Sequence, residues 1–100
     1  MKLGILLTTS PENENTSTVI SISSAAREQG HDVSIFLMYD GVYNVNIKEF
    51  AELAGKSIDI AICAFNAEQR KIGKMDGILF GSQYDHACIA SDVDRFLSFG

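Results

Sequence analysis

Short apolar runs alternate with polar or amphipathic segments along all 100 residues, and this alternation limits the possible folds more than any other feature. Apolar runs without helical spacing are typical of strands that are buried on both faces of a sheet. We predict strands at Lys2–Thr8, Asp32–Tyr39, Ile58–Ala64, Gly77–Phe80 and Arg95–Phe99. Because parallel strands need crossover connections, the segments between them are predicted to be helices. The first begins within Glu14–Thr18 and runs to about Gln29, and the others are at Ile47–Ala54, Asn66–Lys74 and Gln83–Ala90.

This order of elements predicts an α/β fold, a three-layer, doubly wound, flavodoxin-like sheet of five parallel strands. Ordinary domains contain about 100–200 residues, so residues 1–100 are expected to form a single domain. An apolar content of 46% is sufficient for a hydrophobic core and excludes a disordered tail.

The chain has 13 acidic and 8 basic residues, which gives a formal net charge of −5. Nucleic acids are bound by clustered Lys and Arg, so we expect no nucleic-acid partner. The apolar stretch Leu3–Leu7 ends at Thr8, too early for a signal peptide, and no run approaches the roughly 20 residues that span a bilayer. Two cysteines do not make a disulfide scaffold. We therefore expect a cytoplasmic protein with no membrane partner.

In doubly wound sheets, ligands bind beyond the carboxyl ends of the strands, which here are followed by the segments Thr8–Thr16, Tyr39–Val45, Ala61–Asn66 and Gly81–Asp85. A flavin phosphate is usually surrounded by backbone N–H groups of a glycine-containing loop. The first of these segments has no glycine, and its Glu12 and Glu14 would repel a phosphate. We expect no cofactor.

Single positions exclude two protein classes of similar architecture. A response-regulator receiver needs an acidic residue after the first strand and an aspartate after the third, where this chain has Thr8 and Cys63. A low-molecular-weight tyrosine phosphatase needs the motif Cys-x5-Arg, whereas six residues separate Cys63 from Arg70.

Cys63 is the candidate catalytic residue. It lies at or just past the end of the third predicted strand, before a helix that we expect to begin near Asn66, with Gln69 completing a capping box. A thiol that faces a helix N-terminus has its thiolate stabilised by the helix dipole and by free N–H groups. Arg70 and Lys71 would add positive charge about one turn later. The alternative is a buried, unreactive thiol, because free cysteine is among the most buried residue types.

Cys88 and His86, on the fourth predicted helix, are candidate supporting residues, together with Arg70. Cys88 is either a small apolar residue that faces the sheet or a resolving thiol within disulfide reach of Cys63. His86 is either a solvated surface histidine or a proton shuttle and thiolate partner. The spacing of Cys63, His86 and Cys88 matches no recognised metal site, so we expect no metal.

Three segments of the chain resemble the DsrE/DsrF-like family. Phe36–Tyr43 resembles its second strand and turn, Ile60–Cys63 followed by Arg70 and Gly73 resembles its cysteine loop, and Ala90–Phe99 resembles its final acidic turn and strand. The resemblance implies a flavodoxin-like fold and homo-oligomers such as homotrimers or homohexamers. It also implies sulfur-relay chemistry in members that have the cysteine, whose position Cys63 matches.

The resemblance and the placement of Cys63 together predict a sulfur-relay protein, a sulfurtransferase-like carrier that holds a persulfide on Cys63 and exchanges sulfur with donor and acceptor proteins. The alternative is a non-catalytic homo-oligomeric subunit, or a small-ligand-binding module, in which Cys63 is incidental. A redox enzyme that uses Cys63 and Cys88 is less favoured, because the chain has no CxxC motif. The apolar cluster Tyr39–Ile47 further predicts a homo-oligomer that buries this segment.

Overall fold

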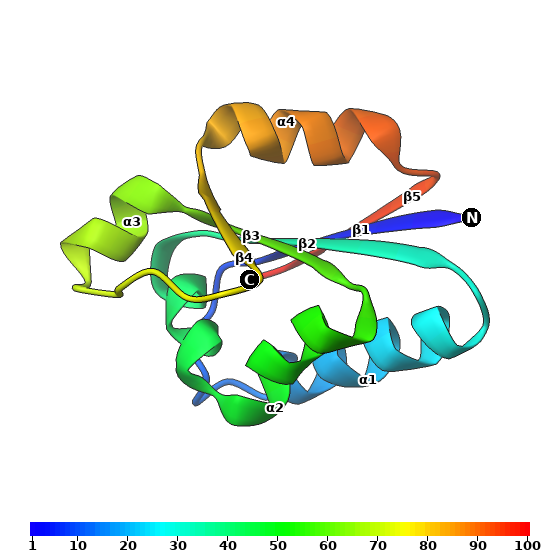
Figure 1. The fold of residues 1–100 in the computed structure, drawn as a ribbon, viewed down its shortest axis with the longest axis horizontal. Coiled ribbons are helices and arrows are strands. Elements are labelled where there is room, and N and C mark those ends of the chain that lie inside the picture. Colours follow the sequence, from blue (N-terminus) through cyan, green and yellow to red (C-terminus); the bar gives the residue numbers. More distant parts are fainter.

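The computed structural model describes residues 1–100, which form one sheet with its connecting helices (Figure 1). In chain order the elements are β1 (Lys2–Leu7), α1 (Asn15–Glu28), β2 (Asp32–Leu37), the 3₁₀ helix η1 (Tyr39–Asn46), α2 (Lys48–Ala51), the 3₁₀ helix η2 (Glu52–Lys56), β3 (Asp59–Cys63), α3 (Ala64–Gln69), β4 (Ile78–Gly81), α4 (Gln83–Asp92) and β5 (Arg95–Phe99). All strands are parallel, in the order β4-β3-β2-β1-β5. The predicted α/β fold, with flavodoxin-like layers around a five-stranded parallel sheet, is confirmed. No helix combines the length and the apolar character that crossing a membrane requires.

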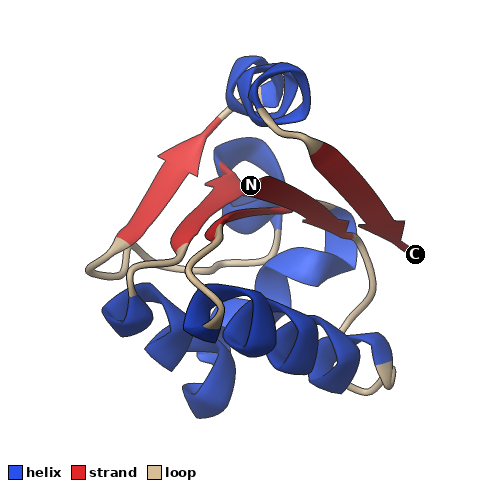
Figure 2. Ribbon diagram, turned by 90° about the vertical axis from the view of Figure 1, so that its right-hand side faces the viewer, coloured by secondary structure: helices blue, strands red, loops and turns tan.

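The two helical layers are unequal. α1 and α2 cover one face of the sheet, whereas α4 covers the other alone and is seen end-on above the strands in Figure 2. Because successive strand residues point to opposite faces, the sheet contributes to two separate cores. The core on the α1 side contains 17 buried residues, whereas the core on the α4 side contains only Phe36, Ala61 and Cys63. Cys63 therefore faces the thinly covered side of the sheet.

The connections that follow β3 and β4 leave the sheet on opposite sides. After α3, the chain returns toward β4 on the α1 side, where Ile72 is buried in the larger core (Figure 1). After β4, the chain continues as α4 on the other face. The two strands are neighbours, with Cys63 in register with Gly81 at their carboxyl ends. Such a switch point is where doubly wound sheets form a crevice for ligands.

The helix predicted at Asn66–Lys74 starts earlier and is shorter. It spans Ala64–Gln69, because Cys63 rather than Asn66 precedes its first turn. It ends before Lys71, whose backbone is left-handed with φ 58°. The turn at Lys71 lets Ile72 reach the larger core. The helical spacing of the sequence does not predict this turn.

The helix predicted at Ile47–Ala54 is divided into α2 and η2. The helical segment continues past the predicted end at Ala54 through η2, and the chain leaves this element at Ser57, whose backbone is left-handed with φ 64°.

The segment Tyr39–Val45, predicted as a loop, folds as most of η1. A side chain at Gly41 would collide with the carbonyl oxygen of Leu7, so glycine allows η1 to lie against the end of β1. Val42 and Val45 are fully buried in the chain's own core. The expectation that the whole cluster Tyr39–Ile47 forms an exposed apolar patch is therefore wrong for the valines; of its aromatic residues, Tyr39 and Tyr43 remain exposed.

Candidate functional site

Cys63 is both the last residue of β3 and the N-cap of α3. The residue is 7% exposed, and its Sγ accepts a hydrogen bond from the backbone N–H of Asn66 at 3.5 Å. Ser, Thr, Asn or Asp usually fills this position, because their oxygen atoms are better acceptors than a thiol sulfur. A charged acceptor binds an N–H group more strongly than a neutral one, so this contact strengthens when the sulfur is a thiolate.

Asn66 ties the first turn of α3 to η1. Its side chain is buried: Oδ1 accepts a hydrogen bond from the backbone N–H of Tyr39 at 2.8 Å, and Nδ2 donates to Gln69 Oε1 at 3.3 Å. Tyr39 has a left-handed backbone with φ 52°, which is unfavourable for a residue with a side chain. The hydrogen bond that Tyr39 donates to Asn66 stabilises this conformation and ties Asn66, whose backbone N–H donates to Cys63, to η1.

Arg70 forms a second tie between the same elements. Its Nε lies 2.9 Å from Asp40 Oδ1, and its Nη1 donates to the carbonyl oxygen of Asn66 at 3.3 Å. No hydrogen bond joins Arg70 to Cys63. An effect of the guanidinium on the thiol must therefore act through space, and the charge of Asp40 opposes it.

A cavity of about 730 Å³ lies beside Cys63 at the carboxyl end of the sheet. The ends of β2, β3 and β4 and the first turn of α3 contribute its lining: Met38, Tyr39, Cys63, Ala64, Phe65, Asn66, Gly81, Ser82 and Gln83. It thus occupies the switch point between β3 and β4. The lining contains no Asp, Glu, Lys, Arg or His side chain.

Cys88 lies outside this cavity. It is exposed on α4 and lines a separate cavity of about 320 Å³ between that helix and the sheet. Both cysteines are free. A hydrogen bond with the Cys88 side chain, together with the charge of its thiolate, raises the pKa of Tyr84, one helical turn earlier.

His86 packs α4 against the sheet. Its ring stacks on Phe36 of β2, with centroids 5.2 Å apart, and lies 5.8 Å from Phe96 of β5. Its Nδ1 lies 3.2 Å from Gln83 Oε1. It is therefore not a fully solvated histidine, and no hydrogen bond joins it to Cys63.

Negative charge gathers in the loop after β1. A hydrogen bond from the Ser10 hydroxyl and one from a backbone N–H lower the pKa of Glu12, and the nearby charge of Asp40 opposes this shift. Glu12 is consequently ionised at neutral pH, and it would repel a phosphate from this loop. No group of three His, Cys, Asp or Glu side chains is arranged to hold a metal ion.

The comparisons with known proteins agree with this architecture. The model of the DsrE/DsrF-like family matches residues 1–99. The chain belongs to the DsrE/DsrF-like family. Members of this family are generally related to sulfur relay.

Among solved structures, the chain is similar to the YchN protein from E. coli, with a TM-score of 0.84, 23% sequence identity and coverage of 99% of both chains. At this identity the similarity establishes the fold. No curated protein matches the chain.

Several residues of the cavity carry no signal in the sequence. Met38, Phe65 and Gln83 each come one or two residues after a strand, and these strands are far apart in the chain. The three residues meet only because β2, β3 and β4 are neighbours in the sheet. The sequence around Asn66 predicts that its side chain caps the helix. Its Oδ1 instead accepts a hydrogen bond from Tyr39, and no local pattern predicts this contact. The left-handed Tyr39 precedes an Asp-Gly pair, which indicates a turn without indicating which residue is strained.

Proposed function

We propose that this chain is a sulfur-relay protein, in which Cys63 accepts a sulfur atom, holds it as a persulfide and passes it to a partner protein. One observation carries the proposal: the Cys63 thiol lies at the switch point of the sheet, beside a cavity, with an N–H group directed at its sulfur. Membership in the DsrE/DsrF-like family supports it.

The chemistry needs no cofactor and no net redox change. The Cys63 thiolate attacks the outer sulfur of a donor persulfide R–S–SH, a new S–S bond forms, and the donor's S–S bond breaks as R–S⁻ leaves. A thiolate of the acceptor then attacks the outer sulfur on Cys63, and Cys63 leaves as a thiolate. Asn66 donates its N–H to this sulfur each time the charge returns to it.

The supporting residues have unequal parts in this proposal. Arg70 would favour the thiolate through its charge and would hold α3 against η1. His86 would act by keeping α4 on the sheet next to Phe36, which shares a core with Cys63. Cys88 would not be required, because it lines a different cavity.

Intact mass spectrometry after incubation with polysulfide tests the proposal. We expect the wild-type chain and Cys88→Ser to gain the mass of one sulfur atom that a reducing agent removes, and Cys63→Ser to gain none. If loading is lost in Cys88→Ser and kept in Cys63→Ser, Cys88 is the sulfur-accepting residue and the assignment to Cys63 is wrong. If neither cysteine is loaded, Cys63 is a structural residue of a non-catalytic subunit or ligand-binding module.

A further inference from the structure

We infer that the cavity beside Cys63 favours sulfur donors in which the groups next to the reacting sulfur are neutral and apolar, and disfavours donors of the same size in which these groups are anionic. This inference rests on the proposed function, because it names the class of substrate that the same thiol would accept. Three features of the site support it.

The first feature is that the side chains of Asn66, Ser82 and Gln83 in the lining already have protein partners. The Asn66 amide is bonded to Tyr39 and Gln69. The Ser82 hydroxyl caps α4 by accepting from the N–H of Tyr84 at 3.2 Å. These contacts leave few donors for an anion that enters without its water.

Gln83, the remaining amide of the lining, is also engaged. Its Nε2 contacts Met38 Sδ at 3.8 Å, and its Oε1 contacts His86 Nδ1. The surface left for a ligand is provided mainly by Met38, Ala64 and Phe65, of which Phe65 is 67% exposed. Such a surface favours apolar groups, whereas an unpaired charge loses hydration there without compensation.

The second feature is the distribution of charge around the cavity. Arg70, the cation that follows α3, is paired with Asp40. At the start of α4, the Asp85 carboxylate accepts the N–H of Ser82 at 2.7 Å. Glu12 in the loop after β1 is ionised, and the chain as a whole has a net charge of −5. The surrounding field therefore opposes an anion rather than attracting it.

The third feature is the burial of the thiol. Because Cys63 is only 7% exposed, a donor must bring its sulfur into the cavity instead of reacting at the surface. The groups next to that sulfur then share the uncharged lining, so their charge decides how readily the donor enters.

Methanethiosulfonates test this selectivity, because the thiolate attacks their sulfenyl sulfur, an S–S bond forms and methanesulfinate leaves. We would compare the neutral hydroxyethyl reagent with the anionic sulfonatoethyl reagent. Cys88→Ser reports Cys63 alone, and Cys63→Ser reports the exposed Cys88. Asp85 and Asp92 line the cavities around Cys88, so their charges already slow the anionic reagent at this reference thiol. A larger ratio at Cys63 therefore cannot result from repulsion by such charges alone.

We expect the ratio of neutral to anionic rate constants to be at least about tenfold larger for Cys63 than for Cys88, since loss of hydration is added to repulsion. Equal ratios for the two cysteines would overturn the inference. Phe65→Lys places a cation in the lining and should lower the Cys63 ratio several-fold. Phe65→Gln removes the same ring without adding charge, and its ratio should stay above that of Cys88; a fall equal to that of Phe65→Lys would also overturn the inference.

A second comparison separates this inference from the proposed function. The persulfide of N-acetylcysteine is anionic at its carboxylate, and the persulfide of N-acetylcysteine amide is neutral there. Faster loading of Cys63 by the amide supports the inference, and equal loading by both donors contradicts it. Absence of loading by either donor contradicts the proposed function, whereas the methanethiosulfonate ratio still decides the chemistry of the cavity.

Discussion

Cys63 occupies a capping position that an oxygen acceptor usually fills, and this makes its serine variant an informative control. A serine hydroxyl accepts an N–H hydrogen bond better than a thiol does, so Cys63→Ser should keep or improve the cap of α3. Its loss of volume is small within the core formed with Phe36 and Ala61. A failure of Cys63→Ser to take up sulfur would therefore report chemistry and not unfolding.

The pair formed by Arg70 and Asp40 separates an electrostatic role from a structural one. If the guanidinium charge favours the Cys63 thiolate, Arg70→Gln should slow alkylation of Cys63 by iodoacetamide about two- to fivefold, the effect of up to ~1 kcal/mol for a partly exposed charge. Asp40→Asn removes the opposing charge and should speed alkylation by a similar factor. The measurement is the rate at neutral pH in a Cys88→Ser background. If both variants slow the reaction, the pair acts only as a tie between α3 and η1.

The sequence places Cys63 correctly because two local signals meet there, the end of an apolar run and the start of a helix. The partners of Cys63 depend on distant residues instead. The hydrogen bond that fixes Asn66 joins residues that are 27 positions apart. His86 contacts Phe36 of β2 and Phe96 of β5, which come from two strands far apart in the chain. Residue types and local spacing do not predict such long-range contacts.

At the scale of elements, η1 is held by one buried side chain. Asn44 is fully buried; its Nδ2 donates to the carbonyl oxygens of Thr9 at 3.0 Å and Gly41 at 2.8 Å, and its Oδ1 accepts from the Thr16 hydroxyl. The amide thus joins the loop after β1, the start of α1 and η1. Since η1 carries Tyr39 and Asp40, the position of the site depends on it.

We predict that Asn44→Ala lowers the free energy of unfolding by about 2–4 kcal/mol, because it leaves several buried polar groups without partners. Asn46→Ala, at an exposed position of the same element, should change it by no more than about 0.5 kcal/mol. Urea unfolding at one fixed protein concentration measures both values. Equal stability of the two variants would show that Asn44 does not hold η1.

Strands were easier to predict than helices for a physical reason. A central strand between two helical layers is apolar along most of its length, and β1, β2 and β3 were predicted to within two residues at each end. The edge strand Arg95–Phe99, which has no buried residue, has the predicted bounds, and β4 differs by one residue at each end. Helix ends depend on tertiary contacts, as the burial of Ile72 beyond α3 shows. The 3₁₀ form of η1 depends on its close approach to β1 at Gly41.

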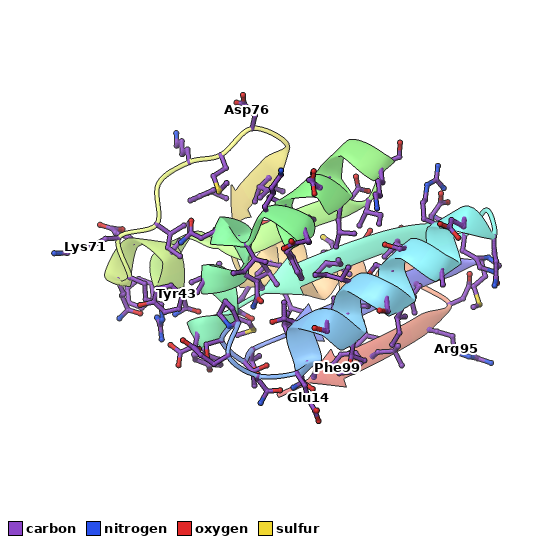
Figure 3. The ribbon with its side chains drawn as sticks, turned by 90° about the horizontal axis from the view of Figure 1, so that it is seen from below. Glu14, Tyr43, Lys71, Asp76, Arg95 and Phe99 are labelled. Atoms are coloured by element: carbon purple, nitrogen blue, oxygen red, sulfur yellow. The ribbon has the colours of Figure 1, made fainter.

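At the scale of the whole molecule, exposed aromatic groups accumulate at the carboxyl end of the sheet. Tyr39 is 56% exposed and Phe65 is 67% exposed, and both line the cavity. Tyr43 lies at the same end as Lys71 and opposite Arg95 (Figure 3). Exposed apolar groups that cluster in this way mark interaction surfaces. Although Val42 and Val45 no longer support self-association, the two tyrosines of η1 still do.

We predict that the chain forms a homo-oligomer, a homotrimer or homohexamer, that covers Tyr39 and Tyr43. Sedimentation should give a mass several times the 10.9 kDa of one chain. Tyr43→Glu should shift the protein toward the monomer, because an unpaired carboxylate in the interface loses its hydration. Tyr84→Glu, at an exposed tyrosine of α4, is the matched control and should keep the wild-type mass. A wild-type monomer at every concentration would contradict the prediction.

Assembly and selectivity are coupled if this prediction holds, because Tyr39 belongs both to the expected interface and to the lining of the cavity. A second copy that covers Tyr39 narrows the opening and removes more water from the path to Cys63. The loss of hydration that an anionic reagent suffers is then larger in the oligomer than in the monomer. Tyr43→Asn removes the ring from the expected interface without adding a charge, so it should raise the rate of the sulfonatoethyl reagent at Cys63 more than that of the hydroxyethyl reagent. Equal changes in the two rates would show that the cavity selects its ligands within a single chain.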